Sequence, residues 1–443
     1  MATEAIISTP GSAIATKADS AVAAWHRTTP ETYEVRFSNG APETWGEGIP
    51  AFTVILRDRR QMQELFSSDA YSAALSFIRG EFDVEGDLIA AVRSQLNRHR
   101  RVWRELLYAA AARLAPHRIE TYLQTRARAA ENIRHHYDRS NEFYKQFLDP
   151  RMVYSCAYFQ TPEATLDEAQ VAKLDHICRK LDLRPGDRFL DIGCGWGSLA
   201  IHAAERYGAQ AIGCTLSRNQ TEYARQSARR VAGAQVAIQE MDFREISGRF
   251  DKIASVGMFE HVGRHRLRSY FRKVHDLLEP DGIFLNHGIV RPEFVTDGAQ
   301  TLFLQRKVFP GGELTHLSGV IRAAELTGFE ILDLEDLRPH YALTCRSWVE
   351  RLQRNVAACL ETVDRETYRT WLLYLAGSAA SFEDGLTSVS QLLLAKRSNR
   401  TRRLTRDYIC AEAKNRAPAK SFRYQTRRIS STRISKPQPE ARA

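Results

Sequence analysis

The fold of this 443-residue chain is decided by the stretch Arg188-Phe189-Leu190-Asp191-Ile192-Gly193-Cys194-Gly195-Trp196-Gly197. Its first half has the pattern of an apolar strand, its second half is a glycine loop, and a helical pattern follows at 198–207. Glycines between a strand and a helix let backbone N–H groups approach a ligand closely, because no Cβ stands in the way. This order of elements is typical of the first unit of a doubly wound α/β sheet.

Strand and helix patterns alternate on the carboxyl side of this stretch. Further strands are predicted at 211–216, 235–241, 252–256 and 283–286. Helices are predicted between them at 218–231 and 265–278. A late segment, residues 387–395, is expected to add a strand at the edge of the sheet. The sequence therefore predicts an α/β, Rossmann-like domain, with a mostly parallel sheet and helices on both faces.

A small α+β domain is predicted ahead of this sheet. Strand patterns at 33–37 and 52–56 are followed by helical patterns at 60–77 and 86–115. The last of these helices is basic and amphipathic, with four arginines beside apolar side chains: Arg98, Arg100, Arg101 and Arg104. The chain is accordingly divided into a disordered leader (1–28), the small domain (29–120), the Rossmann-like domain (121–396) and a basic, flexible tail (397–443).

The net charge of +10 comes from the end of the chain. Residues 396–443 hold 15 Lys and Arg against three acidic residues, a net charge of +12, which leaves −2 for the preceding 395 residues. Such a tail attracts anionic lipid surfaces and nucleic acids alike, and charge does not separate the two.

The sequence contains no apolar run of about 18 residues, as a transmembrane helix requires. The seven scattered cysteines form no Cys-x-x-Cys pair, so neither a disulfide framework nor a metal site is expected.

The glycine loop suits one class of cofactor better than another. Its Gly-x-Gly-x-Gly spacing differs from the Gly-x-Gly-x-x-Gly of dinucleotide sites, and Asp191 stands two residues before the first glycine. A carboxylate there can hold an ammonium group. Asp242, at the end of the third strand, can accept from an adenine amine while Phe243 covers the base. Both carboxylates also suit a role as strand-end caps, but together with the loop they favour S-adenosylmethionine.

Several motifs, taken in their order along the chain, closely resemble cyclopropane-fatty-acyl-phospholipid synthases and their mycolic-acid relatives. The matching strings are His136-Tyr137-Asp138-Arg139-Ser140-Asn141-Glu142-Phe143-Tyr144, Tyr154-Ser155-Cys156-Ala157-Tyr158-Phe159, Asp191 to Gly197, Gly257-Met258-Phe259-Glu260-His261-Val262-Gly263 and Phe309-Pro310-Gly311-Gly312. The resemblance spans about residues 131–396. It implies a class I methyltransferase fold with a seven-stranded sheet, and a small N-terminal domain associated with lipid.

The resemblance also implies a reaction. In that family an alkene of an unsaturated acyl chain attacks the sulfonium methyl, and the resulting cation loses a proton to bound bicarbonate as a cyclopropane ring closes. The positions that match the bicarbonate site are Cys156, Glu260, His287, Ile289 and Tyr341. Singly, a buried His, Cys or Tyr is more often a core residue than a ligand. Five such positions in their motif context favour the site.

The cofactor positions carried over from the resemblance cover three parts of the chain. They are Tyr137, Tyr154 and Ser155; the loop residues Gly193, Gly195 and Gly197; and Thr215, Leu216, Gln220, Asp242 and Phe243. Two departures are visible. Thr215 stands where common methyltransferases have an acidic residue for the ribose, and Gln220 is a substitute for it. Ser378 stands where relatives often have a cysteine, which excludes a covalent thiol mechanism at that position.

The expected substrate determines the expected partners. An acyl chain of an unsaturated phospholipid lies within a bilayer leaflet, so a cytoplasmic protein that is peripheral on the inner face of the membrane is predicted, attracted by anionic lipid. A homodimer is left open, and no specific nucleic acid is expected because no base-flipping or interleaved aromatic motif is present. The rival functions are formation of a methyl- or methylene-branched acyl chain by the same fold, and small-molecule N-methylation.

Overall fold

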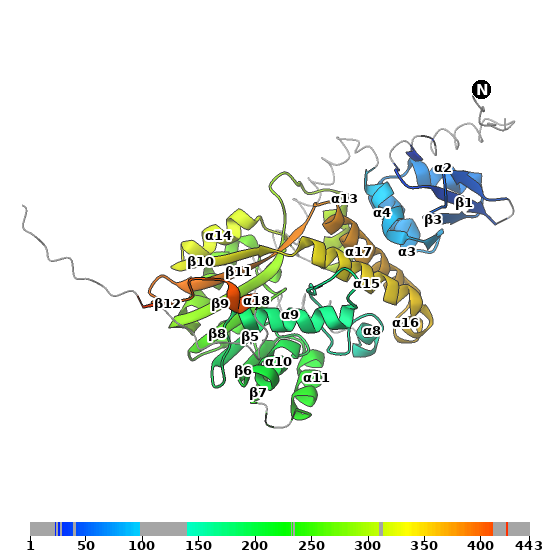
Figure 1. The fold of residues 1–443 in the computed structure, drawn as a ribbon. Coiled ribbons are helices and arrows are strands. Elements are labelled where there is room, and N and C mark those ends of the chain that lie inside the picture. Colours follow the sequence, from blue (N-terminus) through cyan, green and yellow to red (C-terminus); the bar gives the residue numbers. More distant parts are fainter. Residues whose placement is uncertain are drawn as a thin grey trace, which may run out of the picture.

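A large sheet of seven strands organises the chain (Figure 1). The computed structural model describes residues 29–38, 41–97, 140–231, 235–309 and 313–410, and a few isolated positions. The strand order is β10-β11-β9-β8-β5-β6-β7. The strands are β5 (Arg188–Ile192), β6 (Gln210–Thr215), β7 (Val236–Glu240), β8 (Phe250–Val256), β9 (Leu278–Val290), β10 (Phe329–Asp336) and β11 (Ser388–Lys396). Neighbours from β7 to β9 are parallel, and β11 runs antiparallel to both β9 and β10. The predicted fold class is confirmed.

The prediction that residues 387–395 form an edge strand is wrong. The strand exists as β11, but it lies between β9 and β10 and is buried along nearly its whole length. A continuous apolar run such as Leu392-Leu393-Leu394 is the pattern of a strand covered on both faces, which an edge strand rarely is. The edge is β10, whose acidic residues Glu330, Asp333, Glu335 and Asp336 hid its strand character in the sequence.

Both faces of the large sheet are covered by helices, and successive strand residues enter different cores. Phe189 and Leu285 pack with α9 (Leu166–Lys180) and α10 (Ser198–Tyr207) on one face. Leu190 and Phe284 pack with α12 (Leu267–Leu277) and α14 (Leu317–Glu325) on the other. This alternation follows from the two-residue repeat of a strand, and it determines which face of the sheet each side chain enters.

A third apolar core lies beyond the carboxyl ends of the central strands. It is built by α8 (Asn141–Lys145), α15 (Arg338–Arg354), α16 (Val356–Thr362) and α17 (Arg365–Glu383), with α13 (Ala299–Phe303) beside α17. α11 (Arg218–Arg229) follows β6. The helices predicted at 198–207, 218–231 and 265–278 are confirmed as α10, α11 and α12.

The small N-terminal domain has a four-stranded sheet in the order β2-β1-β3-β4. Its elements are β1 (Tyr33–Phe37), β2 (Glu43–Trp45), β3 (Phe52–Leu56), α2 (Arg59–Ser67), α3 (Ala70–Ile78), β4 (Asp83–Gly86) and α4 (Leu88–Asn97). The helix predicted at 60–77 is two helices, because Asp69 caps a new one by accepting from the backbone N–H of Ser72 at 2.9 Å. The helix predicted at 86–115 begins at Leu88. The four arginines named above, Arg98, Arg100, Arg101 and Arg104, lie outside the described residues.

The N-terminal domain packs on α17 and α13 through α3 and α4 (Figure 1). Arg369, on α17, donates to the carbonyl oxygens of Phe77 and Phe82, at 2.6 Å each, and forms an ion pair with Asp83. Phe77 and Leu88 also belong to the same apolar core as Leu375. The two domains are therefore joined by shared packing and not only by the chain between them.

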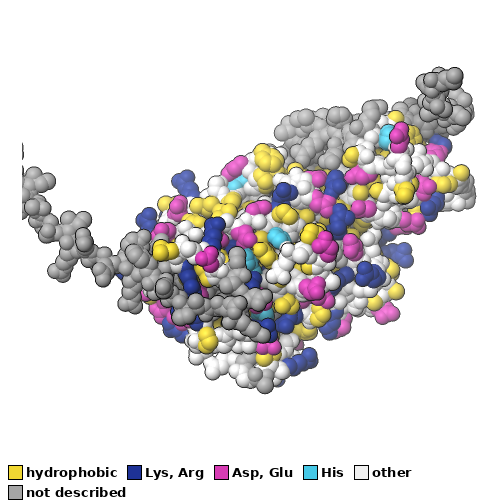
Figure 2. Space-filling model, viewed as in Figure 1, with side chains coloured by type: hydrophobic (Ala, Val, Ile, Leu, Met, Phe, Trp, Pro, Cys, Tyr) yellow, Lys and Arg dark blue, Asp and Glu magenta, His cyan; other side chains and the backbone are white. Residues whose placement is uncertain are grey.

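The first part of the basic tail lies against the large domain. Arg403 forms an ion pair with Asp182 at 2.7 Å, and Arg406 forms one with Asp333. The side chains of Lys and Arg on the face shown in Figure 2 are interspersed with those of Asp and Glu and do not form one patch. No helix among the described residues is long and apolar enough to cross a membrane. The division of the chain into four parts remains a prediction.

Candidate active site

The glycine loop after β5 bends through conformations that glycine adopts freely. Gly193 has φ 78° and Gly195 has φ 55°. A Cβ on Gly193 would lie 2.7 Å from Cγ of Met258, so the loop passes this side chain with no room for another atom. The loop leads into the N-terminus of α10, which directs unpaired backbone N–H groups toward the space in front of the sheet.

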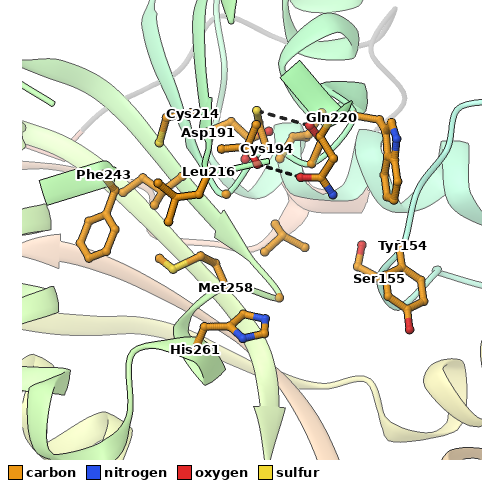
Figure 3. Close-up of a pocket in the computed structure, with 18 of the residues that line it drawn as sticks. Tyr154, Ser155, Asp191, Cys194, Cys214, Leu216, Gln220, Phe243, Met258 and His261 are labelled. Atoms are coloured by element: carbon orange, nitrogen blue, oxygen red, sulfur yellow. Dashed lines mark hydrogen bonds between the residues drawn. The ribbon is translucent and has the colours of Figure 1, made fainter. Parts of the chain in front are cut away.

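A cavity of 270 Å³ opens at this loop (Figure 3). Ten of the predicted cofactor residues line it: Tyr154, Ser155, Asp191, Gly193, Gly195, Thr215, Leu216, Gln220, Asp242 and Phe243. Gly197 does not line it. A Cβ on Gly197 would lie 2.9 Å from Cβ of Ala224, so this glycine permits close packing of α10 on α11. Tyr137 lies outside the described residues.

The wall near Ser155 carries two buried groups of opposite charge. Asp191 is 2 % exposed, and burial raises its pKa to about 7, although the nearby Lys173 opposes the rise. Lys173 is also 2 % exposed, and burial lowers its pKa to about 8. Its Nζ donates to Oγ of Ser155 at 3.0 Å. A carboxylate with so few solvent contacts is suited to hold a cationic ligand group.

The opposite wall suits a ribose and a flat base. Oγ1 of Thr215 donates to Oε1 of Gln220 at 2.7 Å, which fixes the Gln220 side chain at the cavity wall. Asp242 accepts from the backbone N–H and the guanidinium of Arg244, at 2.9 and 2.8 Å, so it caps the turn after β7 and also lines the cavity. Figure 3 shows Leu216, Phe243 and Met258 gathered on one side, and Tyr154 and Ser155 on the other.

A second cavity, of 510 Å³, adjoins the first. Tyr154, Gly257 and His261 line both of them. The second cavity is largely apolar, and its walls include Ala70, Leu96, Ile289, Phe294, Val295, Ala299, Leu304, Phe309, Leu314, Tyr341, Tyr374 and Phe382. A ligand in the first cavity can therefore present a group, at the three shared residues, to an apolar ligand in the second.

Glu260 lies where the two cavities meet, next to His261. Its Oε1 accepts from the backbone N–H of Ile289 at 2.7 Å. Its Oε2 is buried and has no hydrogen-bond partner among the described residues. Burial raises the pKa of Glu260 to about 7, so the carboxyl is partly protonated near neutral pH. The protonated form can donate to a ligand.

His287 lies on β9, two residues before Ile289, and the two side chains face the same side of the sheet. Nε2 of Gln391 contacts its Nδ1 at 3.0 Å; with the amide donating, the ring proton lies on Nε2. That Nε2 is buried without a partner among the described residues. Burial lowers the pKa of His287 to about 3, so the ring is neutral. It is an unpaired donor, like protonated Glu260.

Tyr341 and Cys156 approach this point from α15 and from the segment before α9. Tyr341 lines the second cavity and stacks on Phe382, with the ring centroids 4.5 Å apart. Burial raises its pKa well above the ordinary value, and the neighbouring Cys156 and Glu260 add to the rise. Sγ of Cys156 contacts the carbonyl oxygen of Leu337 at 3.8 Å, one turn before Tyr341. Of the five predicted residues, Glu260, Ile289 and Tyr341 line the cavity, and Cys156 and His287 are buried outside its lining.

Sequence reasoning missed several residues of the two cavities. Lys173 lies on the buried face of α9, whose residues run from Leu166 to Lys180. A lysine at a position that the helical pattern assigns to the buried face indicates a functional role. Met258 and His261 stood in a quoted motif in which only Glu260 was given a role. Tyr374 and Phe382 come from α17, whose approach to the sheet depends on tertiary packing. Ser378, one helical turn after Tyr374 on α17, also lines the second cavity.

Comparison with known proteins gives a consistent result. The family model described as "Mycolic acid cyclopropane synthetase" matches residues 124–392. A "Probable fatty acid methyltransferase" of Pseudomonas putida is 40% identical over 358 residues, which is 78% of this chain and 88% of the relative. The cyclopropane mycolic acid synthase MmaA2 of Mycobacterium tuberculosis is 36% identical, over 60% of this chain and 97% of its own length.

Solved structures agree with these matches. The structure of MmaA2 from Mycobacterium tuberculosis covers 60% of this chain and 98% of its own, with a TM-score of 0.59 and 34% identity. The mycolic acid cyclopropane synthase CmaA1, complexed with SAH and CTAB, covers the same shares, with a TM-score of 0.58 and 34% identity. The family model begins at residue 124, so the small N-terminal domain lies outside that match.

Proposed function

Because the chain belongs to the mycolic acid cyclopropane synthetase family of S-adenosylmethionine-dependent methyltransferases, we propose that it converts the cis double bond of an unsaturated phospholipid acyl chain into a cyclopropane ring. One observation carries this proposal. The cofactor cavity meets a larger apolar cavity beside Glu260, whose Oε2 is buried without a partner among the described residues, and the unpaired Nε2 of His287 lies on β9 two residues before Ile289, which lines the larger cavity. Unpaired buried polar groups are costly, and beside two adjoining cavities a bound ligand would satisfy them.

Bicarbonate fits these unpaired groups. Protonated Glu260 and the neutral His287 ring both offer a hydrogen to an anion, and Tyr341 and Cys156 are held nearby in their uncharged forms. We therefore assign the binding of bicarbonate to Cys156, Glu260, His287, Ile289 and Tyr341. When bound, bicarbonate supplies a weak base beside the acyl chain. The apolar walls exclude water, which would otherwise trap a cationic carbon.

S-Adenosylmethionine supplies an electrophilic methyl group when it is bound. In the proposal, Asp191 and Ser155 hold the methionine end, Gln220 with Thr215 holds the ribose, and Asp242 with Phe243 holds the base. In the proposal, the glycine loop contacts the cofactor between its methionine end and its base. An isolated alkene is a weak nucleophile, so the alignment of the two cavities at Tyr154, Gly257 and His261 must provide much of the rate acceleration.

The substrate would place the protein at a membrane surface. Phospholipid acyl chains lie within a leaflet, so peripheral binding to the inner face of the cytoplasmic membrane follows from the proposal. The basic tail, with a net charge of +12 over residues 396–443, supports this because each basic residue near an anionic surface contributes about 1 kcal/mol. The N-terminal domain is proposed to be the lipid-associated part of the chain.

Product analysis tests the proposed function. The full chain is expressed in cells that make no cyclopropane lipids, and the acyl chains are compared with those of cells carrying an empty vector. The expected product has the mass of the unsaturated chain plus one methylene, no alkene at the former position, and cyclopropane proton resonances. A methyl- or methylene-branched product would instead support the alternative function, formation of branched acyl chains. Unchanged lipids, with cofactor binding intact, would contradict lipid modification altogether.

Cofactor affinity is expected to depend on pH through Asp191. Its pKa of about 7 means that the carboxylate is mostly ionised above pH 7 and mostly neutral below it. Only the ionised form attracts the ammonium group of the cofactor, so the Kd should rise about tenfold between about pH 8 and about pH 6. Calorimetric titration of the purified chain measures it. Asp191→Asn should bind weakly with little pH dependence; a Kd of the wild type that is flat over this range would argue against ammonium binding at Asp191.

A further inference from the structure

A third cavity extends the second one away from the cofactor. It has a volume of 120 Å³ and lies between the N-terminal domain and the helices α13 and α17. We call it the distal chamber. Six residues line both the distal chamber and the 510 Å³ cavity: Ala70, Leu96, Ala299, Gln300, Leu304 and Tyr374. The two spaces therefore adjoin each other along these side chains.

The lining of the distal chamber suits hydrocarbon. Apart from Gln95, Gln300 and the polar tips of its tyrosine and tryptophan side chains, every residue that lines it is apolar. Most of these residues come from the N-terminal domain, among them Phe66, Ala74, Phe77 and Val92. Protein cores are normally packed with few voids larger than a water molecule. An apolar void at a domain interface, adjoining a ligand cavity, is suited to be filled by an apolar part of the ligand.

Gly377 keeps the distal chamber open. It lies in the middle of α17, where glycine weakens a helix relative to alanine. A Cβ on Gly377 would have Cγ1 of Val92, at 4.0 Å, as its nearest neighbour, so the position has room for a side chain. The glycine is therefore not required by a close contact. Its effect is to leave space between α17 and α4.

The 510 Å³ cavity also reaches solvent. Phe294, which lines it, is 77 % exposed. The charged residues of that wall are paired, Arg291 with Asp297 at 2.6 Å and Glu313 with Arg264 at 3.1 Å. An acyl chain that enters past Phe294 would lead its hydrocarbon tail past the reactive point and onward to the distal chamber.

We propose that the distal chamber binds the methyl-terminal segment of the acyl chain, and that Gly377 sets how many carbons beyond the double bond the enzyme accepts. This inference rests on the proposed function and adds a determinant of chain-length selectivity. Much of that site comes from residues ahead of 124, outside the part of the chain that the family model matches. The N-terminal domain would thus contact the substrate inside the protein.

The test uses the purified full chain and vesicles of two phospholipids. Their acyl chains have the double bond at the same distance from the ester and differ only in the number of methylenes beyond it. Gly377→Leu should keep its rate on the lipid with the short segment and lose about fourfold in kcat/KM on the other lipid for each methylene that no longer fits. Gly377→Ala is the matched control and should resemble the wild type.

A second variant keeps the test valid if Gly377→Leu misfolds. Ala74→Phe fills the distal chamber from α3, on the opposite wall, and should give the same selectivity even where Gly377→Leu folds poorly. If both folded variants lose equal activity on both lipids, or lose none, the chamber does not bind the acyl chain. If the wild type forms no product from either lipid, the proposed function fails, and this inference fails with it.

Discussion

Replacing Glu260 with glutamine should lower kcat about 10³-fold, the size of effect expected when a positioned acid or base is removed from a reacting centre. The glutamine oxygen can still accept from the backbone N–H of Ile289, as Oε1 does at 2.7 Å, so the fold around the site is kept. The buried Oε2, however, is replaced by an amide that cannot gain or lose a proton. Turnover of vesicle lipid by the purified variant measures the effect.

Two further measurements make this result specific. Glu260 lines the larger cavity and not the cofactor cavity, so the variant should bind S-adenosylmethionine with a Kd within about twofold of the wild type. Glu293→Gln is the matched control, because Glu293 is an exposed residue that accepts from Ser318. Its activity should equal that of the wild type. A Glu260→Gln variant that retains most of its turnover would remove Glu260 from the proposed bicarbonate site.

The same geometry gives the activity a defined pH dependence. Glu260 donates to an anion only when it is protonated, and its pKa of about 7 means that this form is lost as the pH rises. Asp191 attracts the cofactor only when it is ionised, a form that is lost as the pH falls through about 7. The two opposite requirements predict a bell-shaped profile of kcat/KM with its maximum near neutral pH.

The parts of the structure that could be predicted from the sequence are those set by local patterns. The strand before Gly193 and the alternation of strands and helices after it follow from residues close together in the chain, and the structure agrees from β5 to β9. Asp191, Thr215 and Asp242 stand at or just after the carboxyl ends of β5, β6 and β7, where ligands bind in open α/β sheets, whereas Tyr154, Ser155 and Gln220 were predicted only from the family resemblance. That edge brings Asp191, Thr215 and Asp242 to one cavity although they are far apart in sequence.

The parts that could not be predicted depend on contacts between distant segments. β10 is an edge strand rich in acidic residues, and its pairing with β11 appears only in three dimensions. The aromatic residue Tyr158 stood in a matching motif, but its ring stacks between His176 and His340, away from both cavities. The distal chamber is made where the N-terminal domain meets α17, and nothing in either segment alone indicates it.

Arg369 makes several of the polar contacts at the junction of the two domains. Arg369 is 7 % exposed, donates to the carbonyl oxygens of Phe77 and Phe82, and lies over the ring of Phe77 at 4.0 Å. Its ion pair with Asp83 is weaker support, because the Asp83 side chain is 57% exposed and solvent screens the attraction. The carbonyl bonds are different, since a buried carbonyl that loses its donor is left with an unpaid desolvation penalty.

Arg369→Leu is therefore expected to reduce the free energy of unfolding by about 2–4 kcal/mol, because two carbonyl oxygens lose a charged hydrogen-bond donor. The leucine cannot reach either carbonyl oxygen, and it leaves the ring of Phe77 uncovered. Denaturant unfolding measures the change, and limited proteolysis should show earlier cleavage in the N-terminal domain. The matched control is Arg365→Leu, an exposed position one turn earlier on α17, which should change stability by less than about 0.5 kcal/mol. Equal stability of the two variants would mean that the apolar packing of Phe77 and Leu88, with the ion pairs of Arg93 and Arg346 across the same junction, is enough to hold the N-terminal domain in place.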